Sequence, residues 1–116
     1  MNNQALYKLY IDLGNAQLYG LFIADRQDVN TLIDEDIIID FGDVAGKYSN
    51  IQTSVDRDDI EFVTDDLGVL NVVMGYGLEL GYNPFAQDVS YSYIREMFPE
   101  RDYMIVQQVV DILRSR

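Results

Sequence analysis

The middle of the chain, residues 34–66, constrains the fold most strongly, because acidic residues flank short apolar runs there. The two runs read DEDIIIDFGD (34–43) and DRDDIEFVTDD (56–66), and together they contain eleven Asp and Glu. Lys47 and Arg57 are the only basic residues in this span. Because successive side chains of a strand point to opposite faces, each run predicts a strand with one apolar face to bury and one acidic face to expose.

The strand period assigns the side chains of the first run to faces. Ile37, Ile39 and Phe41 fall on the face that we expect to be buried. Asp36 and Asp40 fall on the opposite face, which we expect to be exposed to solvent. This run therefore predicts a half-buried strand with carboxylates on its outer side.

The same period applies to the second run, where Ile60 and Phe62 share one face and Asp59 and Glu61 share the other. Alternate side chains on one face of a strand lie roughly 6.6 Å apart, about two base-pair rises of DNA. That spacing is compatible with imitation of a row of phosphates. We therefore expect both runs to contribute carboxylates to one acidic sheet face.

The net charge of −12 is concentrated in the same region. Residues 25–66 contain thirteen acids and three bases, whereas residues 1–24 are neutral and residues 67–116 contain six acids and four bases. An acidic field of this kind disfavours nucleic acid and anionic lipid as direct partners. It favours a basic protein surface instead, so the charge predicts a protein partner.

Composition excludes several kinds of chemistry. The chain has no Cys and no His, which removes disulfides, thiolate metal sites, cysteine catalysis and the usual general base near neutral pH. We therefore expect a binding protein without a cofactor rather than an enzyme. A chain of 116 residues is long enough for one domain over residues 1–116. Without an apolar run of membrane-spanning length or a signal-peptide layout, we expect a cytoplasmic protein.

The order of predicted elements indicates an α+β fold. We expect a mostly antiparallel sheet of about five strands, a short helix after the second strand, and C-terminal helices packed on one face. The predicted strands are Leu6–Leu13, Leu18–Ala24, Asp36–Phe41, Tyr48–Val55 and Arg57–Val63. The predicted helices run from Asp25 to Leu32, from Asp65 to about Gly75 with Thr64 as its cap, from Asp88 or Ser90 to Phe98, and from about Arg101 to Arg114.

The last predicted helix has an apolar stripe broader than the usual face of about 100°. The stripe comprises Ile105, Val106, Val109, Val110, Ile112 and Leu113. Burial on two sides explains such a width, either deep within the monomer or against a second copy. A homodimer through the last helix is therefore our second functional hypothesis.

Two motifs point to ligands but lack the required spacing. The stretch GDVAGKYS (42–49) has three residues between its glycines and Tyr48 directly after Lys47, whereas a phosphate-binding loop needs four and Ser or Thr. Counting from Asp56, an EF-hand calcium loop would need Gly at position six, where Glu61 stands. We predict no metal site, and an irregular divalent-cation site remains the alternative.

Tyrosine is abundant, with nine residues, and this amphipathic ring is enriched at protein interfaces. The stretches GYG (75–77), GYNPF (81–85) and YSY (91–93) cluster in the second half of the chain. We expect them to form one exposed aromatic edge, with burial at the border of the core as the alternative.

The opening YIDLGN (10–15), the strand LYGLFI (18–23) and the acidic segment after it resemble the start of antirestriction proteins of the ArdA type, which mimic DNA. The resemblance covers about the first third of the chain. It implies an inhibitor whose carboxylates occupy a nucleic-acid-binding surface of another protein.

These observations predict a small inhibitor or adaptor that docks an acidic face onto a basic surface of another protein. The most specific version is a phage or mobile-element inhibitor that mimics nucleic acid. The predicted contacts are Asp36, Asp40, Asp59 and Glu61, with Asp34, Asp43, Asp58 and Asp66 at the margin.

Overall fold

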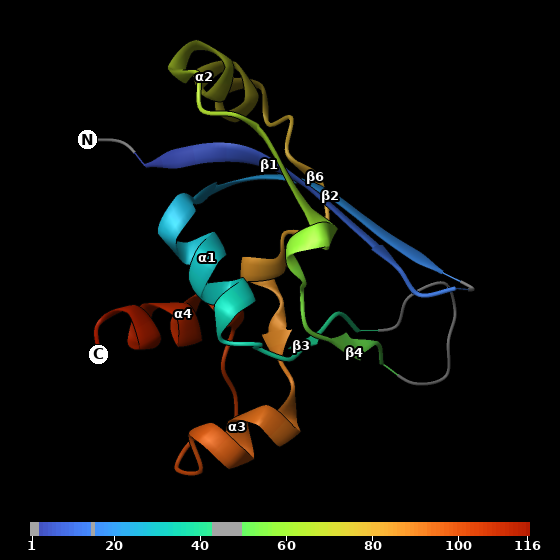
Figure 1. Ribbon diagram of the computed structural model, residues 1–116, viewed down its shortest axis with the longest axis vertical. Helices are drawn as coiled ribbons and strands as arrows, with labels where there is room; N and C mark the ends of the chain where they lie inside the picture. The colour runs from blue at the N-terminus through green and yellow to red at the C-terminus, as the bar shows by residue number, and fades with distance from the viewer. Residues whose placement is uncertain (1–2, 15, 43–49) are drawn as a thin grey trace.

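A computed structural model describes residues 3–14, 16–42 and 50–116 and shows an α+β fold (Figure 1). The predicted fold class is confirmed. The strands are β1 (Gln4–Asp12), β2 (Gln17–Asp25), β3 (Ile39–Asp40), β4 (Gln52–Thr53), β5 (Ile60–Thr64), β6 (Leu80–Gly81) and β7 (Asp88–Val89). The helices are α1 (Arg26–Asp34), α2 (Leu67–Tyr76), α3 (Tyr91–Met97) and α4 (Val106–Arg114), with short 3-10 turns η1 (Arg57–Asp59) and η2 (Pro84–Ala86).

The β1–β2 hairpin is the largest element of the fold, and it matches the first two predicted strands. The two strands pair antiparallel without a break from Gln4–Asp25 to Asp12–Gln17. They form the centre of a four-stranded sheet with the order β5-β1-β2-β6. One face of the hairpin lies in the main core, where Leu9, Leu18 and Phe22 are buried.

Helix α1 covers this buried face, and its start is fixed by the predicted cap. The carboxylate of Asp25 accepts hydrogen bonds from the backbone N–H groups of Gln27 and Asp28, at 2.8 and 3.3 Å. Such a cap satisfies N–H groups that have no partner within the helix. The buried Asp28 then accepts a 2.5 Å hydrogen bond from Arg114, which fixes α4 against α1.

Helix α4 begins at Val106, later than predicted, because Ile105 is extended and forms a bridge with Asp88. Val106, Val109 and Val110 are fully buried in the main core. Burial within the monomer therefore accounts for the width of the apolar stripe. The homodimer through the last helix stays a prediction, but the stripe no longer requires it.

The strands are divided between two sheets rather than gathered in one sheet of about five. β3 lies between β4 and β7 in a separate three-stranded sheet. Asp36 adopts a left-handed backbone conformation with φ of 48°, so the chain turns after α1 and β3 starts only at Ile39. In Figure 1, β3 and β4 lie on the far side of α1 from the hairpin.

Helix α2 packs on the opposite face of the hairpin from α1 and α4, so the helices do not all cover one face (Figure 1). Its buried residues Leu70 and Val73 contact Leu6, next to the half-buried Leu21 and Ile23. These three strand residues make one end of the outer sheet face apolar. That apolar end explains why α2 settles there.

The pairing of β2 with β6 depends on Gly20. A Cβ atom added at Gly20 would lie 1.9 Å from the carbonyl oxygen of Tyr82. The backbone N–H of Tyr82 also donates a 2.8 Å hydrogen bond to the carbonyl of Tyr19. Only glycine permits this close approach between the two backbones.

We predict that Gly20→Ala lowers the free energy of unfolding by about 1–3 kcal/mol, because β6 must move away from β2. Urea unfolding followed by circular dichroism measures this change. Gln17→Ala, at an exposed position of the same strand, is the control and should change stability much less. Equal effects of the two substitutions would contradict the described contact.

Candidate functional site

The predicted contact residues lie in two separate places rather than on one acidic face. Asp36 and Asp40 lie at the three-stranded sheet, whereas Asp59 and Glu61 lie at the edge of the four-stranded sheet. The regular row of carboxylates is also absent from both described segments. β3 has only two residues, and Asp59 belongs to the turn η1 before β5. Sequence alternation is correct for burial in the first run, but in the second run Ile60 is only half-buried and Phe62 is 48% exposed. The prediction of a joint acidic surface is wrong.

The alternation of the first run is confirmed, since Ile37, Ile39 and Phe41 are buried. Asp40, however, is half-buried, and its carboxylate accepts hydrogen bonds from the N–H of Gly42 at 2.9 Å and from Asn50 at 3.1 Å. These bonds hold the two ends of the segment between β3 and β4. Asp43 lies outside the described residues.

Three further acids among the predicted contacts have local structural roles. The carboxylate of Asp59 accepts from the N–H of Asp56 at 2.9 Å, which closes the η1 turn. Asp66, not Thr64, caps α2, because its carboxylate accepts from the N–H of Val69 at 3.0 Å. Asp34 forms an exposed ion pair with Arg57 at 3.4 Å. Surface pairs of this type contribute little to stability.

The remaining three predicted contacts are Asp36, Asp58 and Glu61. All three are exposed, and none forms a hydrogen bond or ion pair through its side chain within the part of the chain that the structure describes. Their carboxylates are therefore available to a partner. Asp58 and Glu61 lie close together in sequence at the edge of the four-stranded sheet, whereas Asp36 lies in the turn after α1.

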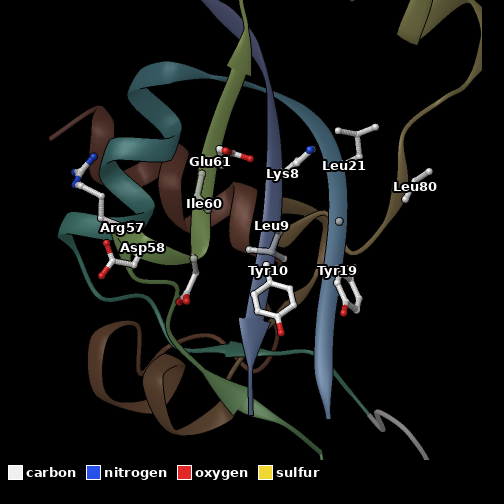
Figure 2. A pocket seen from close by; sticks show the side chains of 12 residues that line it. Lys8, Leu9, Tyr10, Tyr19, Leu21, Arg57, Asp58, Ile60, Glu61 and Leu80 are labelled. Atoms are coloured by element: carbon white, nitrogen blue, oxygen red, sulfur yellow. The ribbon is translucent and has the colours of Figure 1, made fainter. Parts of the chain in front are cut away.

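Asp58 and Glu61 border a shallow hollow of about 850 Å³ on the outer face of the four-stranded sheet (Figure 2). α2 covers only one end of this face, and the rest is open. In Figure 2 the side chains of Tyr10 and Tyr19 lie next to each other on neighbouring strands. The lining residues are Lys8, Leu9, Tyr10, Tyr19, Gly20, Leu21, Arg57, Asp58, Asp59, Ile60, Glu61 and Leu80.

Tyr10 and Tyr19 form the aromatic floor of the hollow. They are directly opposite in the hairpin register, and their ring centroids are 5.1 Å apart with the planes tilted by 60°. Their exposed fractions are 44% and 59%, which leaves ring surface for a ligand. Desolvation raises the pKa of Tyr10 above its ordinary value, and the Asp12 carboxylate adds to this shift. The phenol is therefore neutral at pH 7.

The charged and the apolar side chains around Tyr10 and Tyr19 lie on different sides of the hollow. Glu61 of β5 is opposite Lys8 of β1, and Lys8 is opposite Leu21 of β2. The carboxylates therefore lie on the β5 side, and apolar side chains lie on the β6 side. A planar cation such as a guanidinium suits this arrangement, because it stacks on aromatic rings and binds carboxylates through its N–H groups.

The hollow itself contains three carboxylates and two cations, so its own charge is nearly balanced. The excess of acid in residues 25–66 therefore dominates the long-range field, while the hollow supplies contact surface. Within the described residues, no group of three or more acidic side chains is placed to hold a metal ion. None of the helices described is long and apolar enough to cross a membrane.

The predicted aromatic edge does not form. Tyr76 and Tyr91 are exposed, but Phe85 and Tyr93 are buried. Tyr76 ends α2 and Tyr91 begins α3, and these helices lie at opposite ends of the molecule (Figure 1). Burial in the core explains Phe85, whose ring contacts Phe22 with centroids 6.1 Å apart.

Sequence analysis missed the pair of Tyr10 and Tyr19, although a signal was present. The register of the hairpin places residues of β1 and β2 opposite each other when their numbers sum to 29. That rule pairs Tyr10 with Tyr19 and puts both on the face away from Leu9. Comparisons with protein-family models, curated proteins and solved structures found no match to this chain.

We predict that the acidic residues separate into two classes by their effect on stability. Asp66→Ala should lower the free energy of unfolding by about 1 kcal/mol, because α2 loses its cap. The double variant Asp58→Asn with Glu61→Gln should leave stability unchanged or raise it slightly, because it relieves repulsion between acids. Chemical denaturation of both proteins gives the two values. A large loss of stability in the double variant would mean that these carboxylates are structural.

Proposed function

We propose that this protein is a binding protein without catalytic activity that docks its acidic side onto a basic surface of another protein. The observation that carries the proposal is the open hollow, where the unpaired carboxylates of Asp58 and Glu61 border the exposed rings of Tyr10 and Tyr19. Carboxylates and tyrosines together recognise Arg and Lys side chains. Basic partner surfaces present these side chains.

The overall charge supports the same proposal from a longer range. Residues 25–66 carry a net charge of −10, obtained from thirteen acids and three bases. Like-charge repulsion within such a segment opposes folding, and surfaces of this kind speed association with oppositely charged partners. The field would attract a basic partner, and the hollow would then provide specific contacts.

The ion pair between Asp34 and Arg57 extends the proposed surface. It brings the end of α1 next to the η1 turn, which contains Asp58. Asp34 and Asp58 therefore lie near each other at the β5 edge of the sheet.

We test the proposal with a partner captured from the native host and then purified. Its association rate should fall roughly ten-fold or more as salt rises from low to several hundred millimolar, because the encounter is steered by charge. The double variant Asp58→Asn with Glu61→Gln should reduce the association rate and raise the Kd. Biolayer interferometry at several salt concentrations gives both quantities.

The matched control is the double variant Glu96→Gln with Glu100→Gln, which removes the same charge from exposed positions around the end of α3. It should affect binding much less, because these residues lie away from the hollow. An association rate that does not change with salt concentration would refute the proposed surface. Equal effects of the two double variants on binding would refute it as well.

Mimicry of nucleic acid is the most specific version of the proposal. It rests on the overall charge, because the described strands form no regular row of carboxylates. If the partner is a nucleic-acid-binding protein, this chain should displace a fluorescent DNA or RNA duplex from it with equal molar stoichiometry. A ternary complex of partner, duplex and this chain would exclude mimicry without affecting the broader proposal.

A further inference from the structure

Helix α2 is the least covered apolar element of the described structure. Its sequence, LGVLNVVMGY, contains no charged residue. Only Leu70 and Val73 are buried, and they contact one end of the outer sheet face. Figure 1 shows α2 at the top of the molecule, with open space on the side that faces away from the hairpin.

The apolar surface continues on both sides of the helix in sequence. Eight of the fifteen exposed large apolar residues lie between positions 63 and 80, with exposed fractions of 40–78%. We call this set the α2 face. It comprises Val63, Leu67, Val69, Val72, Met74, Tyr76, Leu78 and Leu80.

The area of the α2 face is comparable to that of a small protein interface. Aromatic residues carry about 150–250 Å² each and aliphatic residues carry less, so these eight residues, aliphatic except for Tyr76, offer on the order of 600 Å² at about half exposure. A standard protein interface takes about 800 Å² from each partner, and the largest apolar patch of a typical monomer is about 300–600 Å². The α2 face therefore lies at the upper end of what a monomer normally exposes and approaches the area that one partner contributes to an interface.

Residues at equal distances from the centre of α2 have side chains of similar size. Read from its centre, between Asn71 and Val72, Gly68 mirrors Gly75 and Val69 mirrors Met74. In an interface with two-fold symmetry, residue i contacts residue j of the partner and j contacts i. An antiparallel pair of α2 helices would therefore place the glycine of one helix against the glycine of the other.

The two glycines have no role in the isolated chain that would explain them. A Cβ atom added at Gly75 meets nothing within 4 Å, and one added at Gly68 meets only the carboxylate of Asp66, at 3.0 Å. Glycine weakens a helix relative to alanine. At about 100° per residue, Gly68 and Gly75 lie on the side opposite Leu70 and Val73, where they would let a second helix approach closely.

The charges near α2 also favour an antiparallel pair. Asp65 and Asp66 lie before the helix, where Asp65 pairs with Arg26 and Asp66 caps α2. Glu79, after the helix, accepts a 2.7 Å hydrogen bond from the N–H of Ile23. An antiparallel arrangement separates the two N-terminal acid pairs by about 15 Å, roughly twice the screening length at physiological salt, and places each pair near the partner's Glu79 instead. A parallel arrangement would bring them together.

We propose that a second copy of this chain covers the α2 face, with the two α2 helices packed antiparallel across a two-fold axis near Asn71 and Val72. This homodimer differs from the one through the last helix, whose central valines are buried in the monomer. It is independent of the proposed docking of acidic residues.

Light scattering coupled to size exclusion tests the dimer directly. The wild-type protein should show twice the monomer mass at high concentration, and Val72→Glu should raise the dimer Kd at least ten-fold. Met97→Glu, at a similarly exposed position of α3, is the matched control and should leave the dimer intact. A wild-type monomer at about 200 µM, or equal effects of the two substitutions, overturns the proposal. Circular dichroism verifies that both variants are folded.

Cysteine cross-linking tests the arrangement, because the chain has no native Cys. Val72→Cys should form a disulfide between protomers, since the two copies of residue 72 are offset by only about 1.5 Å along the axis. Tyr76→Cys should not, because its two copies are about 13 Å apart along the axis, beyond the Cα distance of a disulfide. Efficient cross-linking of Tyr76→Cys, or none of Val72→Cys, overturns the antiparallel pair.

Discussion

The fold depends on the β1–β2 hairpin, which has two faces. The rest of the chain is long enough to bury only one of these faces completely. Residues such as Leu9 and Phe22 lie on the face that α1 and α4 cover, with the Asp28–Arg114 hydrogen bond holding these helices together. The outer face is closed only where α2 contacts Leu6. The rest of it remains open to solvent.

Both proposed surfaces follow from this incomplete coverage. The hollow forms where the sheet is bare, so Tyr10 and Tyr19 are exposed beside the carboxylates of β5 and η1. The α2 face forms because a short helix with apolar residues all round can bury only one side on the end of a narrow sheet. Leu80 lies at the border between the two surfaces.

Local patterns predicted the local structure well. Periodicity identified the hairpin and the buried face of Ile37 and Ile39, and the capping role of Asp25 followed from its position before a helix. The prediction of one joint acidic face was wrong because it required β3 and β5 to be neighbours. Which strands are neighbours depends on topology and cannot be read from periodicity. For α2, apolar residues on every side hid which side packs on the sheet, so exposure of Val72 could not be predicted.

The central claim is that the outer face of the four-stranded sheet, rather than the three-stranded sheet, receives basic side chains. Nuclear magnetic resonance of isotope-labelled protein, titrated at low salt with a short arginine-rich peptide, tests this most directly. We expect the largest chemical-shift changes at Lys8, Tyr10, Tyr19 and Glu61, with small changes at Asp40 and Asp88. Changes concentrated around Asp36 and Asp40, or spread evenly over all exposed carboxylates, would contradict it.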